Sequence, residues 1–508
     1  MLNRIIQFSL KNKLIIGLLT IVLVIWGGWS ATKIPIDAVP DITNNQVQII
    51  TVCPTLAGQE VEQQVTFPIE QSIANLPDIE ETRSISRFGL STITVVFKDD
   101  VDIYFARQLI NERLKEAEDD IPKGIGKPEM GPVSTGLGEI YQYILHPKKG
   151  SEEKYSAMDL RSMQDWIVAR QFNGTEGIAE VNGFGGELKQ YEVAVNPNRL
   201  KAMGVSIADI FNALEKNNQN TGGAYIDKKP HAYFIRGIGL VTSLEDIRNI
   251  AVKDVTGSVP IFIEDVADVR FGSALRYGAM TYNGEKDAVG GVIMMLKGAN
   301  SAEVVNRIKA KIPSIQKSLP DDVVIEPFLD RTDLVKRAMG TVERNLLEGA
   351  LIVIFVLVLF LGNLRAGLIV ASAIPLSMLF ALGLMNVFGV SANLMSLGAI
   401  DFGLIVDGAV IIVESTLHVM ALRKEKVQLS RTEMDEVVEE SAEKMMNSAA
   451  FGQIIILIVY FPILTMTGIE GKMFVPMAQT ISFAILGALI LSLTYIPVMS
   501  SLFLSRKV

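Results

Sequence analysis

The chain has 508 residues, of which 49% are hydrophobic and 20% are charged, and its formal net charge is −9. This apolar bias is high for a soluble protein and is typical of several membrane spans joined to a soluble portion. The negative charge argues against a nucleic-acid-binding protein, which needs a basic face. With one cysteine and three histidines, an intrachain disulfide and a thiolate metal cluster are excluded, and a multi-histidine metal site is not expected.

Six stretches are long and apolar enough to cross about 30 Å of hydrocarbon. They are predicted at Leu14–Ser30, Leu346–Gly362, Gly367–Val387, Leu394–Leu417, Ala449–Met466 and Pro476–Leu504. Because basic residues precede the first stretch, it could instead be a cleaved signal sequence. Trp26 and Trp29 near its outer end favour a retained span with an interfacial aromatic anchor.

The basic residues predict the orientation of these spans. They gather in four groups: Arg4, Lys11 and Lys13; Arg365; Arg423, Lys424, Lys426 and Arg431; and Arg506 and Lys507. All four groups fall on one side when six spans are threaded alternately, and that side should be cytoplasmic. The long connection between spans one and two then lies outside. The acidic segment 421–446 is predicted to be a separate helix along the cytoplasmic face between spans four and five.

The outer connection begins with the pattern of a split-βαβ (ferredoxin-like) sandwich. Strands are predicted at Asn45–Cys53, Glu80–Arg87 and Ser91–Lys98, and helices at Gly58–Ala74 and Val101–Asp119. Asp99 or Asp100 is expected to cap the second helix. A fourth strand after Pro122 would complete the β-α-β-β-α-β order.

The same pattern recurs once, with an interruption. Its strands are predicted at Glu139–His146, Ile178–Phe184, Asp287–Leu296 and Val323–Phe328, and its helices at Ala157–Arg170 and Ser301–Leu319. The interrupting residues have strand and helix patterns of their own, and Asn217–Gly223 is predicted to be a projecting loop. These residues form either an inserted subdomain, which the pattern favours, or an ordinary continuation of one domain.

The predicted fold is therefore an α-helical membrane bundle of six spans plus an α+β outer region. The expected divisions are 1–33 for the N-terminus and span one, 34–135 for the first sandwich, 136–185 with 271–330 for the second, 186–270 for the insertion, and 331–508 for spans two to six.

Span four contains three carboxylates, Asp401, Asp407 and Glu414. Each central charge costs roughly 2.5–3.5 kcal/mol on insertion scales, and the five other spans have no central Lys or Arg to pair with. In a continuous helix Asp407 and Glu414 lie within about 20° of one face, and Asp401 is offset by about 120°. This ladder of acids favours proton or cation handling over a purely structural role. Gly403 and Gly408 beside the acids allow a neighbouring helix to approach closely.

The string Asp401-Phe-Gly-Leu-Ile-Val-Asp-Gly-Ala-Val-Ile-Ile-Val-Glu414 resembles the fourth-span signature of the heavy-metal efflux branch of the resistance-nodulation-division (RND) superfamily. The resemblance extends along essentially the whole chain. It includes Ile34-Pro-Ile-Asp-Ala-Val-Pro-Asp-Ile, Phe67-Pro-Ile-Glu-Gln-Ser-Ile and Gly136-Leu-Gly-Glu-Ile-Tyr-Gln-Tyr.

The resemblance implies a trimeric, proton-driven inner-membrane antiporter of a Gram-negative bacterium, a transporter rather than an enzyme, without a resident cofactor. It implies a periplasmic adaptor and an outer-membrane channel as partners, with membrane lipid around the spans. Asp401, Asp407 and Glu414 correspond to the proton-relay carboxylates. The two sandwiches correspond to porter subdomains in the periplasm, and 186–270 corresponds to the docking subdomain.

The resemblance also bears on the substrate. The drug-exporting branch typically has two adjacent aspartates where this chain has Asp407-Gly408, and copper and silver exporters typically lack the Asp-Phe-Gly string. Zinc, cobalt, cadmium or nickel is therefore expected. Three methionines resemble soft monovalent-metal ligands, but their strand-like positions favour the core: Met280, Met294 and Met295. Metal ligands are not assigned, because three candidate acids are indistinguishable from solvated charges: Glu139, Asp287 and Glu326.

Full-length members of the family repeat this plan twice, so the resemblance implies an N-terminal half. The missing C-terminal half would supply two further porter subdomains and the cationic partner of the relay. Three alternatives stay open at this point. They are an RND exporter of organic compounds, a proton-coupled protein-export auxiliary, and a half-subunit without transport activity of its own.

Overall fold

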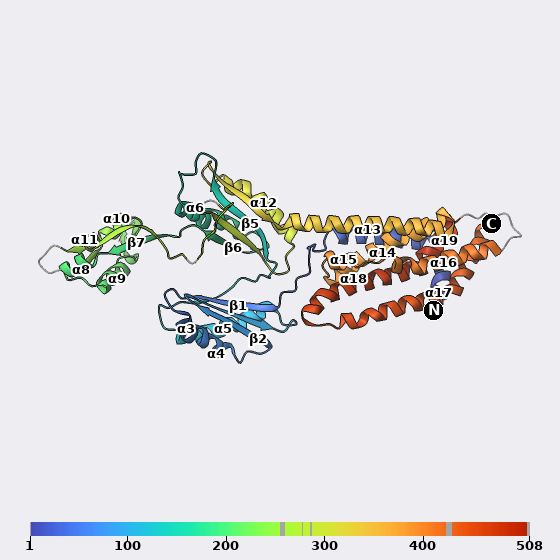
Figure 1. Cartoon of the computed structure of the whole chain (residues 1–508), viewed down its shortest axis with the longest axis horizontal. Coiled ribbons are helices and arrows are strands. Elements are labelled where there is room, and N and C mark those ends of the chain that lie inside the picture. The colour runs from blue at the N-terminus through green and yellow to red at the C-terminus, as the bar shows by residue number, and fades with distance from the viewer. Residues whose placement is uncertain (1, 254–259, 277, 285–286, 423–428, 505–508) are drawn as a thin grey trace.

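A computed structural model of the chain describes residues 2–253, 260–276, 278–284, 287–422 and 429–504. The molecule is elongated, with a helical bundle at one end, two α/β sandwiches in the middle and the inserted segment at the far end (Figure 1). The architecture therefore combines membrane-type helices with an α+β outer region.

Within the described residues, six helical stretches are long and apolar enough to cross a membrane. They are α2 (Lys13–Ala31), α13 (Arg331–Leu361), α14 (Leu364–Phe388), α15 with α16 (Leu394–Gly398 and Phe402–Leu422), α17 (Arg431–Leu464) and α18 (Gly468–Leu493). Helix α14 lies at the centre and packs against α2, α13, α16 and α18. Trp26 of α2, expected at the membrane interface, contacts Phe380 of α14 edge to face.

Span two is longer than predicted, because α13 begins directly after the last strand of the second sandwich. Its 31 residues correspond to about 46 Å of helix, which exceeds the hydrocarbon thickness of about 30 Å. Gly362, at a φ of +58°, ends this helix in the left-handed conformation that favours glycine. Asn363 then caps α14 by accepting a hydrogen bond from the Arg365 amide at 3.0 Å.

The separate cytoplasmic helix predicted at 421–446 is wrong where the structure describes it. Residues Arg431–Leu464 form one helix, so the acidic segment is continuous with span five; residues 423–428 lie outside the described residues. The composition changes near Ala449, but the helix continues through this point and through Gly452, so the change in composition marks no boundary. The acidic half is tied to α2 by an ion pair between Lys13 and Asp435 at 2.6 Å.

The prediction for span six also needs correction. Helix α18 starts at Gly468, before the expected Pro476, and ends at Leu493; after Thr494 a separate helix, α19 (Tyr495–Phe503), begins. Pro497 explains the break, because a proline ring clashes with the carbonyl four residues earlier and donates no hydrogen bond to it. Near the N-terminus, α1 (Leu2–Lys11) packs against α17 and α19.

The first sandwich is a four-stranded antiparallel sheet in the order β2-β3-β1-β4. The strands are β1 (Asn45–Val52), β2 (Ile79–Arg87), β3 (Leu90–Phe97) and β4 (Pro128–Met130). The helical segments are α3 (Gly58–Val61), the π-helical turn η1 (Glu62–Thr66), α4 (Phe67–Ile73) and α5 (Ile103–Asp120). Val47 and Ile49 of β1 pack with Ile110 of α5 in the buried core. Asp102 caps α5, instead of the predicted Asp99 or Asp100.

The second sandwich repeats this arrangement with the sheet order β14-β5-β13-β6. Its strands are β5 (Glu139–Pro147), β6 (Ile178–Gly185), β13 (Val289–Met295) and β14 (Val323–Asp330). Its helical segments are α6 (Ala157–Met163), the π-helical turn η2 (Gln164–Val168), α7 (Ala169–Phe172) and α12 (Ser301–Gln316). In its core the Tyr143 hydroxyl donates to Gln164 at 3.0 Å, and burial raises the pKa of this tyrosine.

The segment between the two halves of the second sandwich has small cores of its own. It contains β7 (Lys189–Val195), α8 (Pro197–Met203), α9 (Ile207–Lys216), α10 (Leu244–Arg248), β10 (Ala251–Lys253), β11 (Ile261–Phe262), α11 (Ile263–Val266) and β12 (Ala267–Ser273). Strands β7 and β12 pair along their full lengths. The loop predicted at Asn217–Gly223 is shorter, because Thr221 begins the exposed hairpin of β8 (Thr221–Lys228) and β9 (His231–Gly237).

Charged side chains join the sandwiches to the bundle. Arg331 at the start of α13 pairs with Asp37 at 2.9 Å. Lys472 of α18 pairs with Asp99 beside the first sandwich at 2.7 Å. Lys297 links the two sandwiches by donating to Asn45 at 3.1 Å. Burial lowers the pKa of Lys297, and the nearby charge of Lys472 acts in the same direction.

Candidate functional site

Span four is broken near its outer end, which changes the geometry expected for its carboxylates. Asn393 caps α15 by accepting hydrogen bonds from the Met395 and Ser396 amides at 3.0 and 2.9 Å. Helix α15 ends at Gly398, and α16 begins at Phe402. The span is therefore two helices joined by a short non-helical link.

Asp401 lies in this link and not inside a helix, so the predicted offset of about 120° from Asp407 does not apply. One oxygen of its carboxylate accepts a hydrogen bond from the Gly403 amide at 2.8 Å, as a helix-capping residue does. A negative charge at this position also interacts favourably with the helix dipole. Asp401 lines a pocket of about 840 Å³ between α13 and the α15–α16 link, together with Asn345 and Gly349 of α13.

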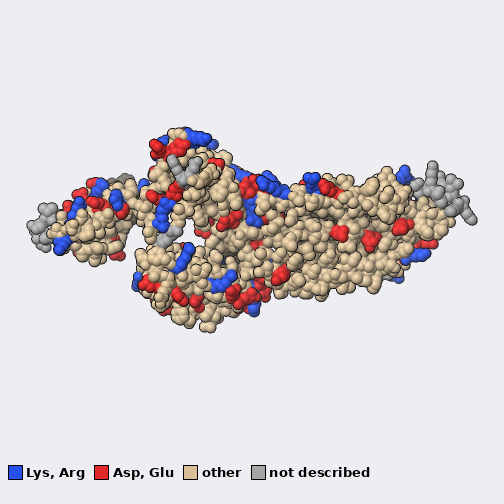
Figure 2. Space-filling view, viewed as in Figure 1, with Lys and Arg blue, Asp and Glu red and all other residues tan. Residues whose placement is uncertain are grey.

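Asp407 and Glu414 lie on α16 and are exposed, whereas the residues next to each of them in the sequence are buried. Their spacing of seven residues places them on one helix face, as predicted, about 10 Å apart along the axis. Neither carboxylate has an ion-pair partner among the residues that the structure describes. Figure 2 shows isolated acidic residues on an otherwise uncharged face of the bundle.

His418 extends this face and was not among the site residues predicted from the sequence. It is exposed and lies one helical turn beyond Glu414, within about 40° of both acids around the helix. The spacing of 407, 414 and 418 was the available signal. We call Asp407, Glu414 and His418 the polar stripe.

The candidate metal-binding acids of the outer region lie apart and are already engaged. Asp287 forms a bidentate ion pair with Arg276, with N···O distances of 2.7 and 3.1 Å. Glu139 accepts from Gln142 at 2.8 Å, and Glu326 contacts the His146 ring at 2.7 Å. Within the described ranges no group of three His, Cys, Asp or Glu residues could hold a metal ion.

The methionines considered as soft metal ligands each have other contacts. Met295 is 6% exposed and belongs to the core of the second sandwich. The sulfur of Met294 contacts the Asn182 amide at 3.6 Å, and Met280 lies against Gly290. The core interpretation therefore holds for Met295.

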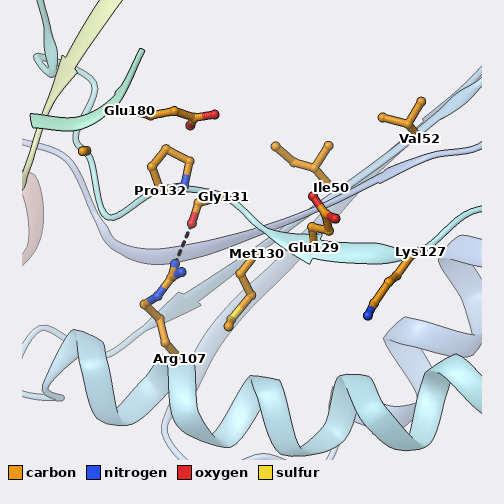
Figure 3. Close-up of a pocket in the computed structure, with 10 residues that line it drawn as sticks. Ile50, Val52, Arg107, Lys127, Glu129, Met130, Gly131, Pro132 and Glu180 are labelled. Atoms are coloured by element: carbon orange, nitrogen blue, oxygen red, sulfur yellow. Dashed lines mark hydrogen bonds between the residues drawn. The ribbon is translucent and has the colours of Figure 1, made fainter. Parts of the chain in front are cut away.

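A second pocket, of about 610 Å³, lies between the two sandwiches (Figure 3). Arg107 of α5 points into it and donates to the Gly131 carbonyl at 2.6 Å, and burial lowers the pKa of this arginine. Lys127 and Glu129 come from the first sandwich, and Glu180 faces them from β6 of the second. This pocket carries charges of both signs.

Comparisons with known proteins assign the chain to a family. The AcrB/AcrD/AcrF family matches residues 5–508. The cobalt-zinc-cadmium resistance protein CzcA of Cupriavidus metallidurans is 47% identical over 100% of this chain and 48% of its own length. The nickel and cobalt resistance protein CnrA of the same species is 41% identical over 100% of the chain and 50% of its own length.

The cation efflux system protein CusA of Escherichia coli K12 is 34% identical over 100% of this chain and 49% of its own length. A crystal structure of a heavy metal efflux pump superimposes with a TM-score of 0.85 and 34% identity, covering 97% of this chain and 48% of that one. The chain thus spans about half the length of these relatives. It belongs to the AcrB/AcrD/AcrF family of the RND superfamily of transporters.

Proposed function

We propose that the protein takes part in proton-driven export of a divalent metal cation, namely zinc, cobalt, cadmium or nickel, across the inner membrane of a Gram-negative bacterium. The observation that carries this proposal is the exposed polar stripe in an otherwise apolar span, with Asp401 at the outer end of that span. Metal efflux as such is supported by the relatives, which are named as cation efflux and metal resistance proteins.

The proton-relay role rests on the cost of placing carboxylates in hydrocarbon. Each charged group at the centre of a bilayer costs roughly 2.5–3.5 kcal/mol on insertion scales, so Asp407 and Glu414 must face protein or water. The distance of about 10 Å between them exceeds a hydrogen bond, so protons would pass between them along water. A carboxyl group whose surroundings alternate between wet and dry changes its proton affinity, which couples proton movement to a conformational cycle.

Divalent metals are the proposed substrates because the chain is more similar to CzcA and CnrA than to CusA. CzcA is named for resistance to cobalt, zinc and cadmium, and CnrA for resistance to nickel and cobalt. The Asp401-Phe-Gly string points in the same direction. No metal ligand is assigned in this proposal.

The proposed working form is a trimer of complete protomers that joins a periplasmic adaptor and an outer-membrane channel. In it the two sandwiches are split-βαβ porter subdomains, which their matching sheet orders support, and residues 186–270 are the docking subdomain. The uncovered polar stripe favours a chain that acts only together with a further surface, because nothing within the described residues compensates its charge. That surface would supply the cationic partner of the relay.

The test is an Asp407→Asn substitution in the complete transport assembly, scored as bacterial growth across zinc, cobalt, nickel and cadmium. Metal resistance should be lost while the amount of assembled protein is unchanged. Glu436→Gln is the matched control, because Glu436 is an exposed acid on the acidic half of α17. Normal resistance in the Asp407 variant would overturn the relay role.

A further inference from the structure

A buried amide in span five has no hydrogen-bond partner. Gln453 of α17 is 1% exposed, and among the described residues neither its Nε2 nor its Oε1 atom is hydrogen-bonded. Ser492 of α18 is also 1% exposed, and its hydroxyl oxygen is unpaired in the same sense. Buried polar groups are nearly always hydrogen-bonded, so three such atoms on the neighbouring helices α17 and α18 require an explanation.

The two side chains converge on one point of α16. A Cβ atom added to Gly408 would lie 2.7 Å from Gln453 Nε2 and 3.0 Å from Ser492 Oγ. Helix α16 packs against both α17 and α18, so the three helices meet at this glycine. Gly408 is buried and points away from the polar stripe, about 100° around the helix from Asp407. Any side chain at position 408 would displace the Gln453 amide.

The chemistry of these groups selects the ligand. The Gln453 amide offers a donor and an acceptor, and the Ser492 hydroxyl offers both. A metal cation would need about six oxygen ligands and would be repelled by the amide N–H groups. A water molecule needs two to four polar partners and can donate to Oε1 while it accepts from Ser492 or Nε2. Gln453 Nε2 lies 2.7 Å and Ser492 Oγ 3.0 Å from the position that a Gly408 Cβ would take, so the two atoms are less than about 6 Å apart. One bridging water, at about 2.9 Å from each atom, can span such a separation.

We propose that Gln453 and Ser492 bind a water molecule between α16, α17 and α18, and that Gly408 is a glycine because this site leaves no room for a side chain. The water completes the hydrogen bonds of the buried amide and hydroxyl. It joins the three helices at the turn that contains Asp407, although none of its ligands belongs to the polar stripe. The site is therefore independent of the proposed transport function.

Melting temperatures of variants of the full chain in lipid nanodiscs test this inference, because the proposal predicts whether each variant is stabilised or destabilised. Gln453→Met keeps the length of the side chain and removes its hydrogen bonding, and Ser492→Ala removes the hydroxyl. If water satisfies these groups, each variant lowers the melting temperature by about 2 °C or more. The double variant then loses less than the two single losses combined, because both variants remove the same bridge. A rise in melting temperature for Gln453→Met, or strictly additive losses, would overturn the proposal.

Ser441→Ala is the matched control for the coupling. Ser441 lies on α17 and is fully buried, but its hydroxyl bonds to the Val437 carbonyl at 2.7 Å. The losses of melting temperature caused by Ser441→Ala and Ser492→Ala should therefore be additive in the double variant. A second measurement covers the case in which the variants fail to fold. A high-resolution structure of the unmodified chain should contain a density peak within hydrogen-bonding distance of Gln453 and Ser492. Well-ordered side chains without such a peak would contradict the proposal.

Discussion

Two exposed faces of the helical bundle differ in their chemistry. The outer face of α13 presents large apolar side chains, including Leu351, Phe355 and Phe360 at 57, 68 and 85% exposure. The outer face of α16 presents Asp407, Glu414 and His418. Contact with lipid has no free-energy cost for apolar side chains, whereas placing a charged carboxylate in the hydrocarbon costs free energy. Both faces are exposed, but their chemistry suits different surroundings: lipid for α13, and protein or water for α16.

Carboxylates in the outer region provide a second contrast. Asp37 pairs with Arg331, and Asp322 accepts hydrogen bonds from Lys154 and Tyr155 at 2.7 and 2.6 Å. Both acids therefore have cationic or hydrogen-bonding partners within the chain. Acids of the outer region are thus paired with nearby cations, including Arg331 of α13, whereas the two acids of the polar stripe have no ion-pair partner among the described residues.

The largest expected effect comes from placing a charge on the lipid face. Phe355→Asp on α13 should reduce the yield of folded protein severely, because a central aspartate costs roughly 2.5–3.5 kcal/mol in the membrane. Fluorescence-detected size-exclusion chromatography of solubilised membranes measures this yield. Phe355→Leu is the control and should behave like the unmodified chain. An equal yield for Phe355→Asp would remove the distinction between the two faces.

Breaking a paired acid should have the next largest effect. Arg331→Ala leaves Asp37 without its partner in a partly buried position, and we expect a loss of about 1–2 kcal/mol of unfolding free energy. Thermal unfolding in nanodiscs measures the loss. Arg344→Ala is the comparison, because its pair with Glu348 is exposed and should contribute less than about 0.5 kcal/mol. Equal losses would show that burial of the first pair is irrelevant.

Removing an acid of the polar stripe should act in the opposite direction. In the chain alone, Asp407→Leu removes a carboxylate that has no partner among the described residues. Its melting temperature should be unchanged or raised by a few degrees, about 2–4 °C per kcal/mol. A clear fall would indicate that Asp407 already has a stabilising partner in the chain, which contradicts the contrast with Asp37.

The smallest effect concerns pH. Hydrogen bonds from Lys154 and Tyr155 lower the pKa of Asp322 from 3.8 to about 2. Because the folded pKa is depressed, the stabilisation is present above pH 4 and is lost as the pH falls towards 2. The difference in melting temperature between the unmodified chain and Asp322→Asn should therefore narrow from pH 6 to pH 3. We expect this change in the melting-temperature difference to be within about 2 °C, because the pair of Asp322 and Lys154 is exposed. A constant difference would contradict this assignment.

The strands and helices of the sandwiches were predictable from the sequence because the alternation of apolar and polar residues in strands, and the helical spacing of apolar residues, are local signals. Strand β1 ends at Val52, where Cys53 was expected, and the last helix of the second sandwich starts at Ser301 as predicted. The break in span four was missed because the mean hydropathy of the whole span stays high despite the charged and small residues at the break. Gly398 at the end of α15 and Asp401 followed by Gly403 were the signals that could have located it.

The site could be predicted only in part. The spacing of Asp407 and Glu414 placed them on one face, and His418 follows from the same reasoning. Which face stays uncovered depends on helix packing, which no local pattern encodes. The inward position of Gly408 against Gln453 depends on contacts between three spans, so sequence could give it only as a permissive small residue. The relay role of the three acids stays a prediction.

The most direct test reconstitutes the complete transport assembly in proteoliposomes and measures zinc and proton movement together. The account predicts that an imposed pH gradient drives zinc against its concentration gradient, with protons moving in the opposite direction. It also predicts that Asp407→Asn abolishes both fluxes while the amount of assembled protein is unchanged. Zinc transport that persists in this variant, or that proceeds without the pH gradient, would contradict the central role of the polar stripe.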